Sequence, residues 1–323
     1  MFVLLAFLAL TIELAVGYPK RVFRAISHPV TWIGALISFL ERMLNRTDWR
    51  DPARKAGGTL TLIVLIAAAG GIGLVIQMLL GDGWSVLITA LIASTLLAQR
   101  SLASHVKDVA QAIEKEGING GRRAVSMIVG RDPEQLDEPA ICRAAIESLA
   151  ENFSDGIVAP AFWLTVGGLP GGAAYKAVNT ADSMIGHKNA RYRHFGWASA
   201  RFDDLINLPA SRLTALLVIS AAAILPGCSA AGACRSVWRD SAKHRSPNAG
   251  WPEAAFAGAL GVALNGPRSY GGVEVNDALM GEGGRREAGS GDIRRALQLY
   301  WTANLIMVAC AGLLALVIFS AHG

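Results

Sequence analysis

Apolar residues along this chain are gathered into long runs, which are separated by polar and positively charged segments. Residues 59–80 contain no charged side chain, and at about 1.5 Å per residue such a run is long enough for a helix to cross a bilayer. The pattern predicts an all-α, polytopic membrane protein with interrupted helices and with polar helices and loops that face the cytoplasm. We assign residues 1–323 to a single integral-membrane domain, with predicted spans at residues 2–17, 59–80, 84–98 and 301–320.

Two more apolar segments, residues 156–174 and 213–225, are predicted to be interrupted. The first contains Pro160, Pro170 and several glycines, and the second reaches only about 13 residues before a proline, which is short for a span. If each segment crossed the membrane once, the basic loop between them would be external and far from the acidic residues that precede it. We therefore favour broken helices that line a cavity enclosed by protein.

The composition supports a membrane protein and argues against one that binds nucleic acid. Hydrophobic residues make up 52% of the chain and charged residues 17%, and the mean hydropathy is +0.38. The net charge of +5 comes from basic residues in loops, without interleaved aromatic side chains. The basic segment 18–58 is predicted to be cytoplasmic. This predicts a retained N-terminal anchor and a multi-pass protein of the cell inner (plasma) membrane, with its active site facing the cytoplasm.

The four cysteines have no CxxC spacing, so no thiolate metal site or disulfide framework is expected. Cys228 and Cys234 are close enough in sequence to pair, but we favour small, buried apolar roles for all four.

The densest group of reactive side chains begins at Glu147. Glu147, Glu151 and Asp155 are spaced i, i+4, i+8, which places them on one face of a helix where like charges repel. A divalent ion, an arginine or a basic substrate is therefore expected beside them. Three carboxylates in hydrocarbon would cost on the order of 8–10 kcal/mol, so we expect them at the water boundary or in a hydrated cavity.

Three later stretches carry further polar side chains. Asp182 suits a metal ion or an ammonium group, and Lys188 and Arg191 suit a phosphate. A solvated helix end would have the same residue types. Asp203 and Asp204 suit Mg²⁺, which prefers oxygen ligands, with a helix cap as the alternative. The remaining candidates for substrate binding are Asn152, Ser154, Asn179, Ser183, Tyr192, Ser246, Asn248, Glu253 and Asn265. The glycines around Asn265 fit either an anion-binding nest or a plain turn.

Known nucleotide-binding and hydrolase motifs are absent from the sequence. There is no G-x-x-x-x-G-K-[ST] loop, no G-x-G-x-x-G after a strand, no G-x-S-x-G and no H-E-x-x-H. A bound nucleotide would therefore need a site built from helices, carboxylates and metal.

Six long motifs occur in order over nearly the whole chain. They are HPVTWIG from His28, VGRDPEQLDE from Val129, RAAIESLAENFSDGIVAPAFW from Arg143, KAVNTADSMIGHKNARY from Lys176, WASARFDDLINLPASRLTALL from Trp197 and SPNAGWPEAAFAGALGVALNGPRSYGG from Ser246. Together they resemble the membrane-bound adenosylcobinamide-phosphate synthases (cobinamide synthases) of cobalamin biosynthesis. The chain departs from many relatives at Tyr18, where they have Asp, and at His187, where they have Tyr.

The resemblance implies that ATP drives amide ligation of adenosylcobyric acid with (R)-1-amino-2-propanol or its O-phosphate. Phosphate transfer to the carboxylate, with Mg²⁺, would give an acyl phosphate that the amine attacks. On this basis Glu147, Glu151 and Asp155 are expected to bind metal or amine, with Asp182 as a further catalytic acid. Lys188 and Arg191 are expected to contact phosphate, Asp203 or Asp204 to complete the metal site, and Asn248 and Glu253 to face the substrate.

Other functions remain open from the residues alone. Broken helices with charged residues also occur in transporters of charged or corrinoid solutes, although no inverted repeat is visible. An enzyme of lipid phosphates would need an array of aspartates on one helix, and here the acids are spread over several motifs. A non-catalytic partner of other corrinoid-pathway membrane enzymes is the third alternative.

Overall fold

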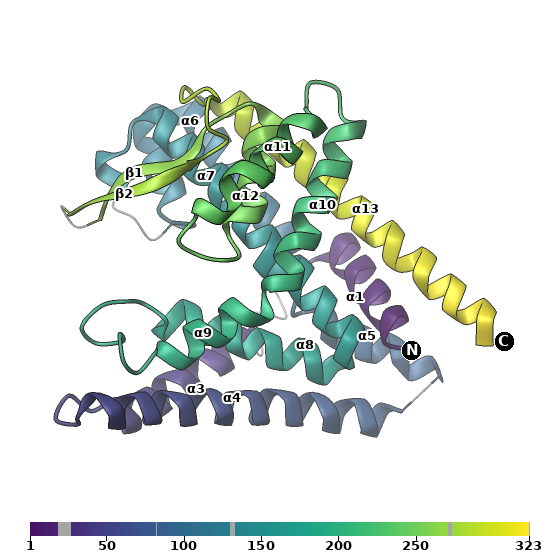
Figure 1. The fold of residues 1–323 in the computed structure, drawn as a ribbon. Helices are drawn as coiled ribbons and strands as arrows, with labels where there is room; N and C mark the ends of the chain where they lie inside the picture. Colours follow the sequence, from purple (N-terminus) through teal and green to yellow (C-terminus); the bar gives the residue numbers. More distant parts are fainter. Residues whose placement is uncertain (19–26, 82, 130–132, 271–272, 323) are drawn as a thin grey trace. The chain divides into compact units, whose positions relative to one another are not determined.

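The computed structural model describes residues 1–18, 27–81, 83–129, 133–270 and 273–322, and it confirms the all-α polytopic membrane class (Figure 1). The basic residues at positions 20, 21 and 24, and part of the motif that begins at Val129, lie outside the described residues. The chain divides into two compact units. Unit 1 comprises Met1–Ala98, Ala159–Asn207 and Ala311–Gly323, and unit 2 comprises Gln99–Val158 and Leu208–Cys310.

Within the described residues, four helical stretches are long and apolar enough to cross a membrane. They are Asp51–Leu80, Gly83–Val125, Glu138–Ile185 and Ser290–Ala321. A fifth span exists if Trp197–Ile206 and Leu208–Ile224, which meet at a bend of 45°, count as one. The apolar helix at Phe2–Val16 is shorter than these.

The elements of unit 1 are α1 (Phe2–Val16), α3 (Pro29–Leu44), α4 (Asp51–Leu80), a short 3-10 turn (Gly83–Ser85), α5 (Val86–Ser94), α8 (Ala159–Ile185), α9 (Trp197–Ile206) and the last turns of α13 (Ser290–His322). In this unit, helices α3, α5, α8 and α9 pack against α4, and α1 packs against α5 and α8. The core between α3, α4 and α8 contains Ile37, Leu65, Ala177, Ala181, Ile185 and Phe195.

Helix α8 is broken inside the segment that the sequence predicts to be interrupted. Gly168 has φ of 62°, and Pro170 follows within the same helix. The break removes the helical acceptor of the Leu169 amide, and the side chain of Gln77 on α4 replaces it, with Oε1 accepting that hydrogen bond at 2.9 Å. The break is thereby tied to the neighbouring helix.

Unit 2 consists of shorter helices and one β-hairpin. Its elements are α6 (Gln99–Val125), a 3-10 turn (Pro133–Gln135), α7 (Glu138–Phe153), a π-helical turn (Ser154–Val158), α10 (Leu208–Ile224), α11 (Ala230–Asp240), a 3-10 turn (Ser241–Lys243), α12 (Gly250–Leu260), β1 (Leu264–Tyr270), β2 (Val273–Met280) and α13 as far as Cys310. The strands β1 and β2 pair antiparallel, with a register shift between Asn265 and Pro267.

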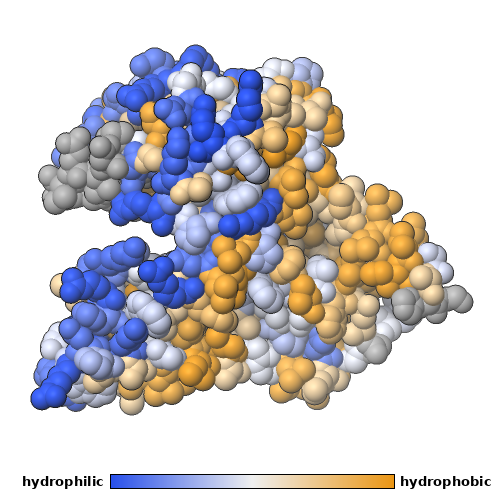
Figure 2. All heavy atoms as spheres, viewed as in Figure 1, coloured by the Kyte–Doolittle hydropathy of each residue, from blue (hydrophilic) through white to orange (hydrophobic). Residues whose placement is uncertain are grey.

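The surface separates polar from apolar side chains within each unit. Large apolar residues of α4 and α13 are exposed, including Leu79 at 81% and Phe319 at 76%, as expected of helices that face lipid. Figure 2 shows hydrophilic residues at the end of unit 1 where α4 begins, and in unit 2 over α6 and α11.

Candidate functional site

Glu147 on α7 is held by the backbone of the hairpin in unit 2. Its side chain is buried, and its Oε1 accepts a hydrogen bond from the Asn265 amide at 2.7 Å. Asn265 and Gly266 have φ of 59° and 94°, at the bulge where β1 meets α7. The predicted anion-binding backbone thus binds the protein's own carboxylate. The side-chain Oδ1 of Asn265 is buried and accepts no hydrogen bond from a described residue.

The π-helical turn ends the regular face on which the three acids were expected. Glu147 is buried and Glu151, one turn later on α7, is exposed, while Asp155 lies beyond the end of α7 in the π-helical turn and is half-buried. The sequence spacing therefore does not give the three carboxylates a common environment. Within the turn, the Oγ of Ser154 is buried and has no hydrogen-bond partner among the described residues. Such turns are frequent at functional sites.

Other predicted residues of unit 2 have local structural contacts. Asn152 donates from Nδ2 to the Ser148 carbonyl oxygen at 2.9 Å, one turn earlier on α7. The Oγ of Ser246 accepts hydrogen bonds from the backbone amides of Asn248 and Ala249, at the turn before α12.

Two of the predicted substrate-binding side chains are buried at the start of α12, Asn248 in the turn before it and Glu253 in its first turn. Glu253 Oε1 lies 3.7 Å from His244 Nε2. Helix α12 packs against α7, α10 and β1, so these residues and Glu147 belong to elements in mutual contact.

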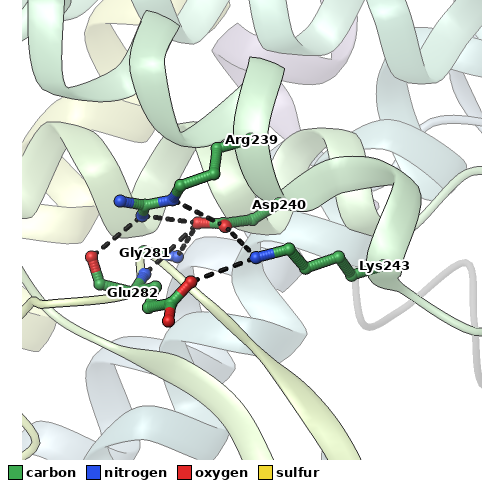
Figure 3. A network of polar contacts seen from close by, with 5 residues as sticks. All are labelled: Arg239, Asp240, Lys243, Gly281 and Glu282. Carbon is green, nitrogen blue, oxygen red and sulfur yellow. Dashed lines mark hydrogen bonds and ion pairs between the residues drawn. The ribbon is translucent and has the colours of Figure 1, made fainter.

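Asp240 fastens the end of the hairpin to α11, a role that the sequence did not indicate. Its buried carboxylate accepts hydrogen bonds from Arg239, Lys243 and the backbone amides of Gly281 and Glu282, at 2.7 to 3.2 Å (Figure 3). Burial alone would raise the pKa of Asp240, but the hydrogen bonds of Arg239, Glu282 and Lys243 lower it to about 2. No local sequence signal pairs Asp240 with a segment some forty residues later.

Unit 1 brings three of the predicted acids together. Asp182, near the end of α8, lies close enough to Asp203 and Asp204 of α9 for their charges to interact. Asp203 is buried, and its Oδ2 accepts a hydrogen bond from Asn207 Nδ2 at 2.9 Å. Tyr175 donates to Asn207 Oδ1 at 2.8 Å and so fixes the amide. The second oxygen, Asp203 Oδ1, is buried without a hydrogen bond of normal geometry from any described residue.

The remaining predicted polar residues of unit 1 surround this acid cluster. Asn179, one turn before Asp182 on α8, also interacts with the Asp203 carboxylate. Ser183 returns its Oγ to the Asn179 carbonyl oxygen at 2.9 Å, within the same helix. Lys188 is exposed, and its charge acts on Asp204.

The guanidinium of Arg191 forms an ion pair with Glu41 of α3 at 2.7 Å, and its expected contact with phosphate stays a prediction. Tyr192 follows it in a turn, with its backbone amide donating to Asn189 Oδ1 at 2.9 Å.

The CobD/Cbib protein family model matches residues 6–300. The chain belongs to the CobD/Cbib family. The family assignment confirms the resemblance that the six motifs indicate.

Curated relatives cover almost the whole chain. Two that are named cobalamin biosynthesis protein CobD come from Sinorhizobium sp and from a strain of Rhodobacter capsulatus. The first is 52% identical over 303 residues, covering 93% of this chain and 94% of the relative. The second is 49% identical over 308 residues, covering 95% of each. No solved structure matches the chain.

The acid cluster of unit 1 has the donor chemistry of a Mg²⁺ site without being a complete one. In the described parts of this CobD/Cbib chain, no group of three or more His, Cys, Asp and Glu side chains is arranged to hold a metal ion. Mg²⁺ usually takes one or two carboxylates and fills its other positions with water and substrate phosphates. The buried Oδ1 of Asp203, which accepts no hydrogen bond of normal geometry from the described residues and lies near Asp204, fits that requirement. The predicted metal site that also includes Glu151 and Asp155 stays a prediction.

The buried role expected of all four cysteines is confirmed only for Cys142, and Cys228 is half-buried. All four lie in the described part of the chain and none is in a disulfide; Cys142 is buried, while Cys234 and Cys310 are exposed.

Proposed function

We propose that this chain is an ATP-dependent, amide-forming ligase of cobalamin biosynthesis. Its reaction would join adenosylcobyric acid to (R)-1-amino-2-propanol or its O-phosphate, giving adenosylcobinamide or its phosphate. The names of the CobD relatives support the pathway and a corrinoid substrate. The structural observation that supports a Mg²⁺-dependent reaction is the buried Asp203 carboxylate, which has Asp182 beside it and whose Oδ1 accepts no hydrogen bond of normal geometry from the described residues. A buried acceptor left open in this way is costly unless a ligand uses it.

The chemistry requires activation of a carboxylate, because its oxygen is a poor leaving group. The propionate oxygen of adenosylcobyric acid attacks the terminal phosphorus of ATP, which forms an acyl phosphate and releases ADP. The amine nitrogen then attacks the acyl carbon, the new C–N bond forms, and the C–O bond to phosphate breaks. The amino group must lose a proton, and we assign that proton to a carboxylate oxygen of Asp182.

The residues of the acid cluster have distinct tasks in this proposal. Asp203 and Asp204 would hold Mg²⁺, which when bound neutralises the phosphate charge. Asn207 and Tyr175 orient Asp203 through their hydrogen bonds, so that its second oxygen stays available. Lys188 is an exposed cation whose charge acts on Asp204, and it would contact phosphate.

The proposed location follows from charge and hydropathy. Basic residues of the described segment 42–55 precede the long apolar part of α4, which is the pattern of a cytoplasmic flank. We infer an inner-membrane protein whose acid cluster faces the cytoplasm, where ATP is available.

The test uses purified protein with adenosylcobyric acid, ATP, Mg²⁺ and either amino alcohol, with products identified by mass spectrometry. We expect an amide product and stoichiometric ADP from the wild type. Asp203→Asn should lower kcat at least a hundredfold, while Asp108→Asn, an exposed acid on α6, should leave kcat within twofold. Full activity of Asp203→Asn, or no amide product from the wild type, would refute the proposal.

The break at Gly168 and the bend between α9 and α10 also favour a second candidate, a transporter of a charged or corrinoid solute. ATP hydrolysis that requires both the corrinoid acid and the amino alcohol would exclude it. Uptake of a labelled corrinoid into proteoliposomes without chemical change would favour it.

A further inference from the structure

A second polar feature of unit 1 shares no lining residue with the cluster of Asp182, Asp203 and Asp204. It is a pocket of about 600 Å³ between the end of α3, the start of α4 and the loop that follows α8. We call it the arginine pocket, and its lining consists of Asn45, Arg46, Thr47, Asp48, Arg54, Ala190 and Arg191. Three of these residues are arginines, and only Asp48 is acidic. The volume is within the range of small-molecule binding sites and exceeds that of a lone phosphate ion.

The guanidinium of Arg54 is fixed in the wall of this pocket. Arg54 is buried, its Nε donates to Asn45 Oδ1 at 3.0 Å, and its Nη2 donates to the Arg191 carbonyl oxygen at 2.5 Å. Asn45 also donates from Nδ2 to the same carbonyl oxygen at 3.2 Å. No acceptor among the described residues engages Nη1 of Arg54. A buried cation that is already oriented loses little entropy when an anion binds it.

The other two arginines add charge at the rim. Arg46 is exposed and pairs with Asp48 at 3.3 Å, a solvated contact that an incoming anion can replace at little cost. Arg191 is oriented by Glu41, so part of its positive charge is already compensated. The lining and Glu41 together leave an excess of one positive charge, and Arg46 is the side chain most able to move toward a ligand.

These features match one kind of ligand chemistry. A phosphate group accepts paired hydrogen bonds from guanidinium groups, and arginine is preferred over lysine where that paired geometry matters. The room beyond a single phosphate leaves space for the remainder of an ester.

We propose that the arginine pocket binds the phosphate group of a phosphate ester through Arg46 and Arg54. In its strongest form this rests on the ligase function proposed above, since ATP and aminopropanol O-phosphate are both phosphate esters. The same chemistry is present in the headgroup of an anionic lipid, because the pocket lies where the apolar helix α4 begins. The experiment has to separate these two sources.

The first arm measures binding of sodium tripolyphosphate to the full-length protein in a neutral detergent by calorimetry. Arg46→Gln is an exposed substitution that should fold normally, and we expect it to weaken binding about tenfold. Arg54→Gln should weaken binding at least as much, and its fold can be checked by circular dichroism. Arg50→Gln removes the same charge four residues away, outside the lining, and should change affinity less than twofold.

The second arm measures thermal stabilisation in phosphatidylcholine nanodiscs with and without phosphatidylglycerol. The pocket would be assigned to a lipid headgroup if phosphatidylglycerol stabilises the wild type, Arg46→Gln removes this stabilisation, and the wild type does not bind tripolyphosphate. Binding of tripolyphosphate in detergent that Arg46→Gln weakens would assign the pocket to a free phosphate ester. If neither response depends on Arg46 or Arg54, the pocket proposal is wrong.

Steady-state kinetics separate this proposal from the ligase function. Suppose that the wild type forms the amide, that Arg46→Gln and Arg54→Gln keep their KM for ATP and for aminopropanol phosphate, and that neither variant weakens the response to tripolyphosphate or to phosphatidylglycerol. The pocket proposal then fails and the ligase proposal stands. If binding depends on the two arginines but no amide forms, the ligase proposal fails and the pocket remains.

Discussion

Replacing Asp240 by asparagine tests whether the hairpin depends on a single buried carboxylate. The side chain accepts two hydrogen bonds from Arg239, one from Lys243 and two from the backbone amides of Gly281 and Glu282 (Figure 3). Asparagine keeps one acceptor oxygen but presents an NH₂ group to these donors. The hairpin end therefore loses charge-assisted bonds while keeping its shape.

The magnitude follows from the pKa of Asp240. Folding lowers it from 3.8 to about 2, and a shift of this size corresponds to about 2 kcal/mol of stability. Because the folded-state pKa is depressed, this stability is fully present above pH 4 and is lost as the pH falls through 2. Arg239 and Lys243 are half-exposed and regain water in the variant, so we expect a loss near 2 kcal/mol.

The assay is denaturant unfolding in detergent at several pH values, together with hydrogen exchange at the end of β2. Asp240→Asn should be about 2 kcal/mol less stable than the wild type at pH 7, with faster exchange at Gly281, and the difference should shrink below pH 4. Glu116→Gln, which breaks an exposed ion pair with Arg123 in the same unit, should cost under about 1 kcal/mol. Equal stability of Asp240→Asn and wild type at pH 7 would refute the reasoning.

Two other predictions concern close contacts. A Cβ at Gly58 would lie 1.7 Å from the Phe195 carbonyl oxygen, so Gly58→Ala should destabilise unit 1 by about 3 kcal/mol. Gly71 lies in the same helix with open space around it, so Gly71→Ala should be neutral or slightly stabilising. Similar melting temperatures for the two variants would contradict this prediction. Glu147→Gln replaces the charged acceptor of the Asn265 amide and should cost about 1–2 kcal/mol on denaturant unfolding, with a fall in kcat that exceeds the effect on KM. An unchanged kcat would contradict the role in metal or amine binding that the sequence predicts for Glu147.

The apolar part of the fold was predictable because hydrophobic runs of sufficient length have few alternatives in a membrane. The charge-free run in α4 and the apolar C-terminal helix illustrate this. The hairpin at Leu264–Tyr270 and Val273–Met280 was not predicted. Its segment is short, glycine-rich and polar, and its position depends on contacts with α7 and α11 that no local pattern encodes.

For the candidate site, residue types were easier to predict than partners. Asp182, Asp203 and Asp204 were singled out by composition and lie near one another. The contact between Glu147 and Asn265 joins residues 118 positions apart, and only the fold reveals it. Arg46 and Arg54 were interpreted as charges that determine membrane topology, and their place in a pocket depends on the loop that carries Arg191.

The most direct test of the proposed ligase chemistry follows the oxygen atoms of the substrate. Adenosylcobyric acid labelled with ¹⁸O in its free propionate carboxylate is incubated with the purified protein, ATP, Mg²⁺ and the amino alcohol. An acyl phosphate transfers one labelled oxygen to the inorganic phosphate that leaves, so we predict one ¹⁸O in phosphate for each amide formed. Amide formation with no ¹⁸O in phosphate, or with the label in AMP, would contradict the mechanism.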